Sequence, residues 1–529
     1  MRRWFIVGPF LLLVACGAGT SEVSRAGGGA ETVAGRVTYE ARHPTPQGAS
    51  REVERRPGRH LAVALVGGAG AVVAEGRTDR DGRFALEGPA DAAAVRVCAR
   101  VRVRGHDVAV ADDSLGRETH CFDTPVEDPG AELVVHVGDD EGHGGALHVV
   151  DTLLTGLDAV ARWTDRTLPP LFTYWVRGQT REWSFYRGER PAGSGRYALE
   201  LLGGQPGQQS VTDTDEHDEA IILHELGHFV MDRLSTDSST GGMHPRGARI
   251  DPGLAWEEGR ATWFALAVLG DPSYRDTIGV EPWGTLRVDE NLESGEDPVA
   301  GIASETSVAK VLWDLSDGPG TDLPDEDEDG VALGPAAVLE AMVGLAEEDG
   351  SYGSLPAFLD YLVREGPLAR DALAAMLTRT GEPVDELLPG DGVPWPPPVA
   401  IGDSVTGTID GVTQPAPGGG RNLPLTGFSA IHTYRVRVEE PGMLVLRLYI
   451  QGSGRILDRT DLDLELLDRR ADALARGASE RPLETVGHLV QPGTYIVRVR
   501  DGGRGNRADY RLEVLQETLG GPPIPLVPP

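Results

Sequence analysis

The sequence predicts a multidomain protein in which a central α+β domain, mainly helical around its functional site, lies between two all-β sandwich domains. A chain of 529 residues is long enough for roughly three domains. Apolar and polar residues alternate with a period of two on both sides of the middle of the chain, which is typical of β-strands. Between these regions, residues 220–231 form an apolar, helix-like segment that contains two histidines and a glutamate.

The first residues of the chain predict export. Residues 1–3 are Met-Arg-Arg, and residues 4–15 form an apolar run of 12 residues, which suits a signal peptide and is too short to span a bilayer. The run ends in Leu-Val-Ala-Cys, which resembles the bacterial lipobox. This resemblance implies a lipoprotein signal peptide over residues 1–16 and a lipid on Cys16; an ordinary secretory signal is the alternative. Residues 17–34, rich in Gly, Ala and Ser, predict a flexible tether.

We therefore expect a protein that is anchored to the bacterial cell envelope by its lipid. Gly17 rather than Asp follows Cys16, which favours the outer membrane, on its periplasmic or surface side. No other segment is apolar enough to span a bilayer.

Residues 35–137 predict the first β-sandwich, because residues 35–39, 60–66 and 95–103 alternate with a period of two. The segment 78–86, Thr-Asp-Arg-Asp-Gly-Arg-Phe-Ala-Leu, reads as a turn followed by a strand. This region resembles the transthyretin-like, carboxypeptidase regulatory-like module. Asp79 and Asp81 are expected to form the turn and not to bind a metal.

Cys98 and Cys121 both fall in this first sandwich. An exported protein meets an oxidising compartment, so we expect a disulfide between them, although their spacing alone does not prove it. No Cys-x-x-Cys pattern accompanies them, so they are not expected to bind a metal.

Residues 224–228, His-Glu-Leu-Gly-His, predict a zinc site. His224 and His228 lie one turn apart on the same helix face, so both imidazoles can reach one metal ion. Glu225 lies about 100° round the helix, close enough to activate a metal-bound water. The flanks are apolar, and burying these polar groups without a partner would be costly. These flanks favour a metal site over a chance match.

A third ligand is expected in residues 254–265, Leu-Ala-Trp-Glu-Glu-Gly-Arg-Ala-Thr-Trp-Phe-Ala. Met231 and Leu234 stand where a metzincin would have Gly and His, which excludes that class. The downstream segment resembles the Trp-Leu-x-Glu-Gly-x-Ala segment of the gluzincin metallopeptidases, the thermolysin and aminopeptidase N-like group. This resemblance implies a zincin-like domain over residues 140–388 and Glu258 as the third ligand.

Glu257 remains the alternative third ligand. Thr262, one turn after Glu258, is expected to orient a ligand histidine. The chain departs from the family in a longer segment of 29 residues between His228 and Glu258. It also lacks the Gly-x-Met-Glu-Asn segment of the aminopeptidases and the Asn-Glu-x-x-Ser-Asp pattern of thermolysin. The resemblance thus covers only the zinc site and its domain.

Other features of this domain are less specific. Tyr274 and His244 are candidates for stabilising an oxyanion, and ordinary loop roles are the alternative. Residues 307–317 predict an amphipathic helix with a structural role. Residues 322–330 carry alternating carboxylates closed by a glycine, which suits Ca²⁺. Ala336 occupies the place of the bidentate acid of an EF-hand, so a solvated acidic loop is the alternative.

The last part of the chain predicts a linker, a sandwich and a tail. Residues 389–399 are Pro-rich and predict a stiff linker. Residues 400–516 again alternate with a period of two and include Asp-Leu-Asp-Leu at 461–464 and Pro-Gly-Thr-Tyr at 492–495. This order resembles the bacterial pre-peptidase C-terminal (PPC) domain, a β-sandwich often appended to secreted peptidases. Residues 517–529 are expected to be a disordered tail.

Together these features predict an exported, lipid-anchored zinc metallopeptidase, an endopeptidase that acts on a protein or peptide substrate. Its Zn²⁺ would be held by His224, His228 and Glu258, with Glu225 as the general base. A net charge of −33 argues against a nucleic-acid partner. The alternative is a non-catalytic adhesion or carbohydrate-binding lipoprotein with a structural zinc site, which a fourth protein ligand would close.

Overall fold

The computed structural model describes residues 30–518 except for 69, 90–91, 113–117, 129, 140–141, 180–182, 190–194, 237, 295–296, 298, 325–329, 349–351, 391, 412–425, 452–460 and 503–506. The expected signal peptide with Cys16, residues 325–329 of the acidic loop and residues 519–529 of the tail lie outside the described residues. Strand β1 begins at Ala30 and β24 ends at Thr518. Residues 30–34 and 517–518 are therefore strand, not tether or tail, because they pair with β7 and β19.

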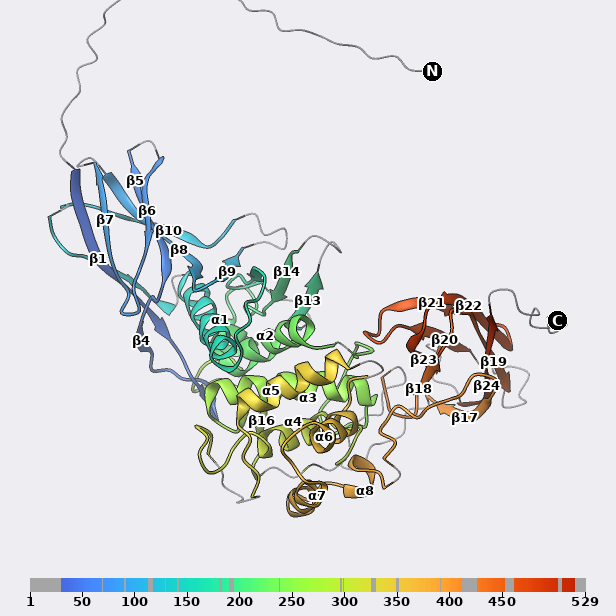
Figure 1. Ribbon diagram of the computed structural model, residues 1–529. Coiled ribbons are helices and arrows are strands. Elements are labelled where there is room, and N and C mark those ends of the chain that lie inside the picture. The colour runs from blue at the N-terminus through green and yellow to red at the C-terminus, as the bar shows by residue number, and fades with distance from the viewer. Residues whose placement is uncertain are drawn as a thin grey trace, which may run out of the picture.

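Two β-sheets form the N-terminal part of the molecule, at the upper left of Figure 1. In the first sheet, β1 (Ala30–Ala41) pairs in parallel with β11 (Leu133–Val137) and antiparallel with β4 (Glu54–Pro57) and β7 (Arg83–Pro89). The second sheet has the order β13-β14-β12-β9-β8-β5-β6, with β10 also paired to β8. Its strands are β5 (Leu61–Gly67), β6 (Val72–Arg77), β8 (Ala92–Val103), β9 (His106–Ala111), β10 (Cys121–Pro125), β12 (Leu171–Tyr174), β13 (Phe185–Glu189) and β14 (Tyr197–Glu200).

The second sheet crosses the expected boundary near residues 137–140. Strands β12, β13 and β14 come after this boundary, yet β12 pairs in parallel with β9 of the expected N-terminal sandwich. Apolar side chains of both regions also belong to one continuous core that extends from Val33 to Leu388. The first β region and the helical region are therefore fused through a shared sheet and core. A disulfide joins Cys98 of β8 to Cys121 of β10, which are paired in the same sheet.

The helical region follows this sheet and occupies the centre of Figure 1. Its helices are α1 (Gly144–Trp163), α2 (Glu219–Leu234), α3 (Pro252–Leu269), α4 (Glu305–Asp314), α5 (Pro335–Glu347), α6 (Leu355–Arg364), α7 (Arg370–Arg379) and α8 (Val384–Leu387), with the short 3₁₀ turns η2 (Gln209–Val211) and η3 (Asp215–His217). The hairpin β15 (Ser273–Ile278) and β16 (Thr285–Asn291) lies beside them, as does the small hairpin β2 (Pro44–Thr45) and β3 (Gly48–Ala49). None of the helices within the described residues is both long enough and apolar enough to cross a membrane.

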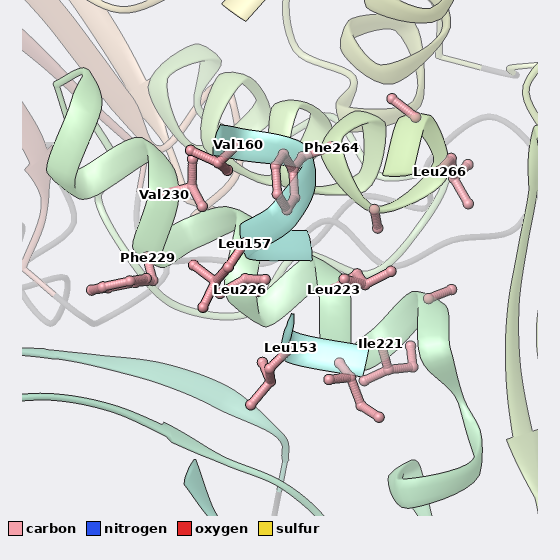
Figure 2. Close-up of a cluster of buried hydrophobic side chains, with 14 of the residues drawn as sticks. Leu153, Leu157, Val160, Ile221, Leu223, Leu226, Phe229, Val230, Phe264 and Leu266 are labelled. Atoms are coloured by element: carbon pink, nitrogen blue, oxygen red, sulfur yellow. The ribbon is translucent and has the colours of Figure 1, made fainter. Parts of the chain in front are cut away.

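Helices α1, α2 and α3 pack together through apolar side chains, as Figure 2 shows. Leu157 of α1, Leu226 of α2 and Phe264 of α3 are buried in this cluster. The ends of α3 are well defined by its sequence. Asp251 caps its first turn by accepting hydrogen bonds from the backbone N–H groups of residues 253 and 254, and Gly270 ends it with a left-handed φ of 68°. This packing fixes the relation between α2 and α3, on which the candidate site depends.

The C-terminal region is a separate β-sandwich, drawn in orange and red in Figure 1. Its two four-stranded sheets have the orders β17-β24-β19-β22 and β18-β23-β20-β21. The strands are β17 (Ser404–Asp410), β18 (Ile431–Val438), β19 (Gly442–Gln451), β20 (Leu462–Leu467), β21 (Ala473–Gly477), β22 (Leu483–Val490), β23 (Gly493–Asp501) and β24 (Arg507–Thr518). It has its own apolar core. The chain is thus a multidomain, β-rich protein with helices around its middle.

Candidate metal centre

Three potential metal ligands meet between α2 and α3. His224 and His228 lie on the same face of α2, and Glu258 faces them from α3. The two Nε2 atoms are 3.1 Å apart. The Oε2 atom of Glu258 is 3.2 Å from each of them. The three donor atoms therefore form a nearly equilateral triangle.

This triangle fits a divalent metal ion. Ligands about 2.0–2.1 Å from a tetrahedral zinc ion are roughly 3.3 Å from one another, close to the observed separations. Two imidazole Nε2 atoms at hydrogen-bond distance cannot both present lone pairs without repulsion, and a shared cation removes this conflict. Two nitrogen donors and one carboxylate oxygen are also a ligand set that zinc favours. The residues present are therefore able to hold zinc.

Thr262 lies where it can orient one of the histidines. Its Oγ1 atom is 3.1 Å from Nδ1 of His224. With Nε2 of His224 turned to the metal position, Nδ1 carries the proton and donates it to the threonine hydroxyl. Such a hydrogen bond fixes the tautomer and the ring orientation of a ligand histidine.

The neighbouring glutamate, Glu257, points to other partners. Its Oε1 atom accepts hydrogen bonds from the backbone N–H of Ser238, at 2.9 Å, and from the Ser238 hydroxyl, at 3.1 Å. Its Oε2 atom accepts a hydrogen bond of 2.9 Å from Nε of Arg260, a fully buried side chain. Glu258 and not Glu257 is thus the carboxylate beside the histidines.

Burial and mutual charge shift the pKa values of the groups at the site before a metal binds. Burial opposes ionisation of Glu258, but His244, His228 and His224 hold its pKa well below the usual range. Burial would lower the pKa of His228, but Glu258 raises it to about 9. Burial also raises the pKa of Glu225, against the influence of the two histidines of α2. Glu225 is 7% exposed, which leaves it in a poorly hydrated position suited to proton transfer.

The site opens into a cleft with a volume of about 1260 Å³. Glu225, His224 and His228 line it, as do residues of the edge strand β13 and of the hairpin β15–β16. Tyr186 of β13 and Tyr274 of β15 belong to this lining. The cleft is large enough for an extended peptide segment or a ligand of similar size.

His244 and Tyr274, which the sequence suggested for an oxyanion, both lie at this cleft. Nε2 of His244 is 3.5 Å from Oε2 of Glu258, and its Nδ1 is 2.9 Å from Oε2 of Glu305. Burial would lower the pKa of His244, but these two carboxylates raise it to about 10. The ring of Tyr274 lies 5.9 Å from the ring of His224, and the guanidinium of Arg246 lies 4.6 Å above Tyr274.

Glu305 was not expected at the site from the sequence. It is the first residue of α4, which the sequence placed at residues 307–317 and assigned a structural role. An acid in the first turn of a helix is expected from the helix dipole alone, so its sequence context gave no signal. Helix α4 packs closely on α3, because Gly259 has no side chain where it meets Val308, and this contact brings Glu305 to His244.

A comparison with protein families found one match within this region. The family model for the Mycolysin C-terminal domain matches residues 185–340. This segment runs from β13 to α5 and contains His224, Glu225, His228 and Glu258. The match associates the chain with peptidases but covers less than half of it. No curated protein matches the chain.

Several solved structures are similar to parts of the chain. The pre-peptidase C-terminal domain of a collagenase from Bacillus anthracis is 12% identical, with 22% of this chain and 92% of that chain covered and a TM-score of 0.17. The periplasmic lysozyme inhibitor PliG from Aeromonas hydrophila is 14% identical, with 23% and 96% covered and a TM-score of 0.15. An isomalto-dextranase from Arthrobacter globiformis is 11% identical, with 22% and 24% covered and a TM-score of 0.15.

Proposed function

We propose that this protein is a zinc-dependent peptidase that cleaves peptide bonds within a polypeptide. The observation that carries the proposal is the triangle of His224, His228 and Glu258 with Glu225 beside it in an open cleft. The match of residues 185–340 to the Mycolysin C-terminal domain supports a peptidase context. The missing amine-binding segment of the aminopeptidases favours cleavage inside a chain.

The residues at the site have three different roles in hydrolysis: binding the metal, transferring the proton and orienting a ligand histidine. A zinc ion held by the three ligands would lower the pKa of a bound water and polarise the peptide carbonyl. Glu225 accepts the proton of the attacking water and then donates it to the leaving amine. Its buried position raises its pKa, which makes the carboxylate a stronger base for the first of these proton transfers. Thr262 holds His224 in the orientation that leaves Nε2 free for the metal.

An open metal site favours catalysis over a purely structural role. A structural zinc site is closed by four protein ligands, whereas a catalytic one keeps a position for water. Around this centre, the donor atoms that lie within 4.8 Å of one another come from three residues of the described chain, His224, His228 and Glu258. These three face a cleft, where substrate and water can enter.

We also propose that the protein is exported and held to the bacterial cell envelope by a lipid on Cys16. The disulfide between Cys98 and Cys121 supports an oxidising compartment. A Cys16→Ala variant expressed in a bacterium is expected to leave the membrane fraction. Recovery of this variant with the membranes, at the level of the wild type, would contradict the anchor.

A Glu225→Gln variant tests the catalytic proposal. The wild type is expected to cleave members of a broad peptide library, and the variant to lose at least about 100-fold in rate because it cannot transfer the proton. Its zinc content, measured by mass spectrometry, should remain that of the wild type because the three ligands are intact. Glu439→Gln, at an exposed position of the C-terminal sandwich, is the control and should cleave normally. Turnover by Glu225→Gln at the wild-type rate would refute the mechanism.

A further inference from the structure

A second group of potential metal ligands lies beside the first helix turn of α2. Asp213 and Asp215 precede α2, and Asp276 lies on β15. Each offers a carboxylate oxygen, and these oxygens all lie within 4.8 Å of one another. The backbones meet at the same place, because Asp213 forms a β-bridge with Ile278. Two segments more than 60 residues apart in the sequence thus bring three acids together.

Two of these carboxylates each have one oxygen that no described residue contacts through a hydrogen bond. Oδ2 of Asp213 accepts a hydrogen bond of 2.6 Å from Nη1 of Arg287, and Oδ2 of Asp276 lies 3.8 Å from Nε of the same arginine. The Oδ1 atoms of both aspartates are buried and have no hydrogen-bond partner among the described residues. Asp276 is only 8% exposed. A buried oxygen without a partner is costly, so these atoms indicate a ligand.

Within the described part of the chain, the acids of the cluster outnumber the basic side chains paired with them. Asp215, 3% exposed, contacts the hydroxyl of Ser184 and faces Asp213, Asp276 and the fully buried Asp218. Asp218 is hydrogen-bonded by Thr277. Arg287 touches Asp213 and Asp276, while the nearby Arg246 is already paired with Glu290.

Burial and this repulsion raise the pKa of Asp215 well above its usual range. They also raise the pKa of Asp276, to about 7. A bound cation would offset both the burial of these carboxylates and the repulsion between them.

We propose that Asp213, Asp215 and Asp276 form a calcium site. All three donors are carboxylate oxygens, which hard cations prefer, and no nitrogen or sulfur ligand that would favour zinc belongs to the group. Calcium accepts six to eight oxygen ligands in a flexible geometry, so backbone oxygens and water can complete the shell.

The position of the site gives calcium a structural role next to the cleft. It would join the segment before α2 to β15, which carries Tyr274. Asp215 and Asp276 themselves line the same cleft as His224 and Glu225. Calcium there would fix the start of the helix that carries His224 and His228 without entering the hydrolytic step. Calcium would therefore bind whether or not the neighbouring centre hydrolyses peptides.

Calcium binding can be measured directly on the full chain with its zinc site kept saturated. Equilibrium dialysis with radioactive calcium should show one more bound ion in the wild type than in Asp276→Asn or Asp213→Asn. Asp81→Asn, which changes a half-exposed acid in the N-terminal sandwich, should bind as many ions as the wild type. If Asp276→Asn does not fold, Asp213→Asn replaces it, because Asp213 is less buried.

Thermal unfolding of the same proteins gives an independent readout. Calcium should raise the melting temperature of the wild type and of Asp81→Asn by several degrees, and that of Asp276→Asn or Asp213→Asn much less. Without calcium, Asp276→Asn should melt at or above the wild-type temperature, because it removes a repelling charge.

Equal calcium binding by the wild type and both cluster variants would overturn the proposal and place the ion elsewhere. A cluster that instead recognises a cationic side chain of a substrate would also overturn it. In that case calcium would have no effect on unfolding, and Asp276→Asn would lose a preference for peptides that contain Lys or Arg.

Discussion

At the scale of single residues, Glu257 and Glu258 differ in what their carboxylates contact. They are neighbours on α3, about 100° apart around its axis, and this angle separates their environments. Glu258 faces the two histidines of α2, whereas Glu257 holds Arg260 and Ser238. A pair of adjacent acids thus serves both the candidate metal site and the core that supports it.

Substitution of each glutamate by glutamine should separate these roles. Glu258→Gln removes the carboxylate from the triangle and should leave the protein with little bound zinc. Glu257→Gln should retain zinc but lose about 3 kcal/mol of stability, because the buried Arg260 keeps its charge without its carboxylate partner. Zinc content by mass spectrometry and thermal unfolding measure the two effects. The assignment of Glu258 as ligand fails if Glu257→Gln loses the metal and Glu258→Gln keeps it.

At the scale of elements, the close approach of α2 and α3 sets the geometry of the centre. Gly227, inside the His-Glu-Leu-Gly-His segment, allows this approach. A Cβ atom added at Gly227 would lie 3.0 Å from Cα and 3.1 Å from the carbonyl oxygen of Ala261 on α3. Both are backbone atoms of a buried helix, so neither can move without shifting α3. The glycine therefore helps to keep Glu258 within reach of the histidines.

A Gly227→Ala variant tests this role of the helix contact. The added methyl group should separate α2 from α3, reduce stability by about 1–3 kcal/mol and weaken zinc binding at least several-fold. Gly390→Ala, where an added Cβ meets no atom within 4 Å, is the matched control. The measurements are thermal unfolding and a competition titration with a zinc chelator. Unchanged zinc affinity in Gly227→Ala would show that the helix separation does not determine the site.

At the scale of the whole molecule, the C-terminal sandwich docks on the segments that surround the centre. The backbone N–H of Asp251, the cap of α3, donates to the carbonyl oxygen of Thr426 at 2.9 Å. The Thr426 hydroxyl donates to the carbonyl of Met243, beside His244, at 2.6 Å. Arg498 of β23 donates to the hydroxyl of Tyr352, at 3.0 Å. The sandwich is thus attached to the start of α3 and to the loop that carries Met243 and His244 and lines the cleft.

Loss of the Arg498 contact should loosen this docking. Arg498 is almost fully buried. The Tyr352 hydroxyl, which accepts from Arg498, also donates a hydrogen bond of 2.8 Å to the carbonyl oxygen of Ser238. Arg498→Met is expected to make the linker at residues 389–399 at least several-fold more sensitive to limited proteolysis. Arg511→Met changes a half-exposed arginine that is paired within the same sandwich. The linker of this variant should be cleaved by the added protease at the wild-type rate. Equal cleavage of both variants would contradict a docked sandwich.

Local patterns in the sequence were sufficient to predict part of this molecule. The four-residue spacing of His224 and His228 fixes their common face on any helix, and alternation with a period of two predicts the strands of both β regions. The structure has both features. It also joins Cys98 to Cys121 by a disulfide. Zinc binding and catalysis stay predictions, which the geometry of the three ligands and the family match support. The lipid on Cys16 also stays a prediction.

The tertiary structure decided what depends on contacts between distant segments. The choice of Glu258 over Glu257 depends on which face of α3 meets α2, and the pairing of His244 with Glu305 depends on how α4 packs. The shared sheet across residues 137–140 depends on the pairing of β12 with β9, and the carboxylate cluster depends on the meeting of β15 with the start of α2. The sequence by itself determined the chemistry that each helix and strand can offer, because that follows from local periodicity. Only packing in three dimensions decided which groups meet, because burial and pairing between remote segments leave no regular spacing along the chain.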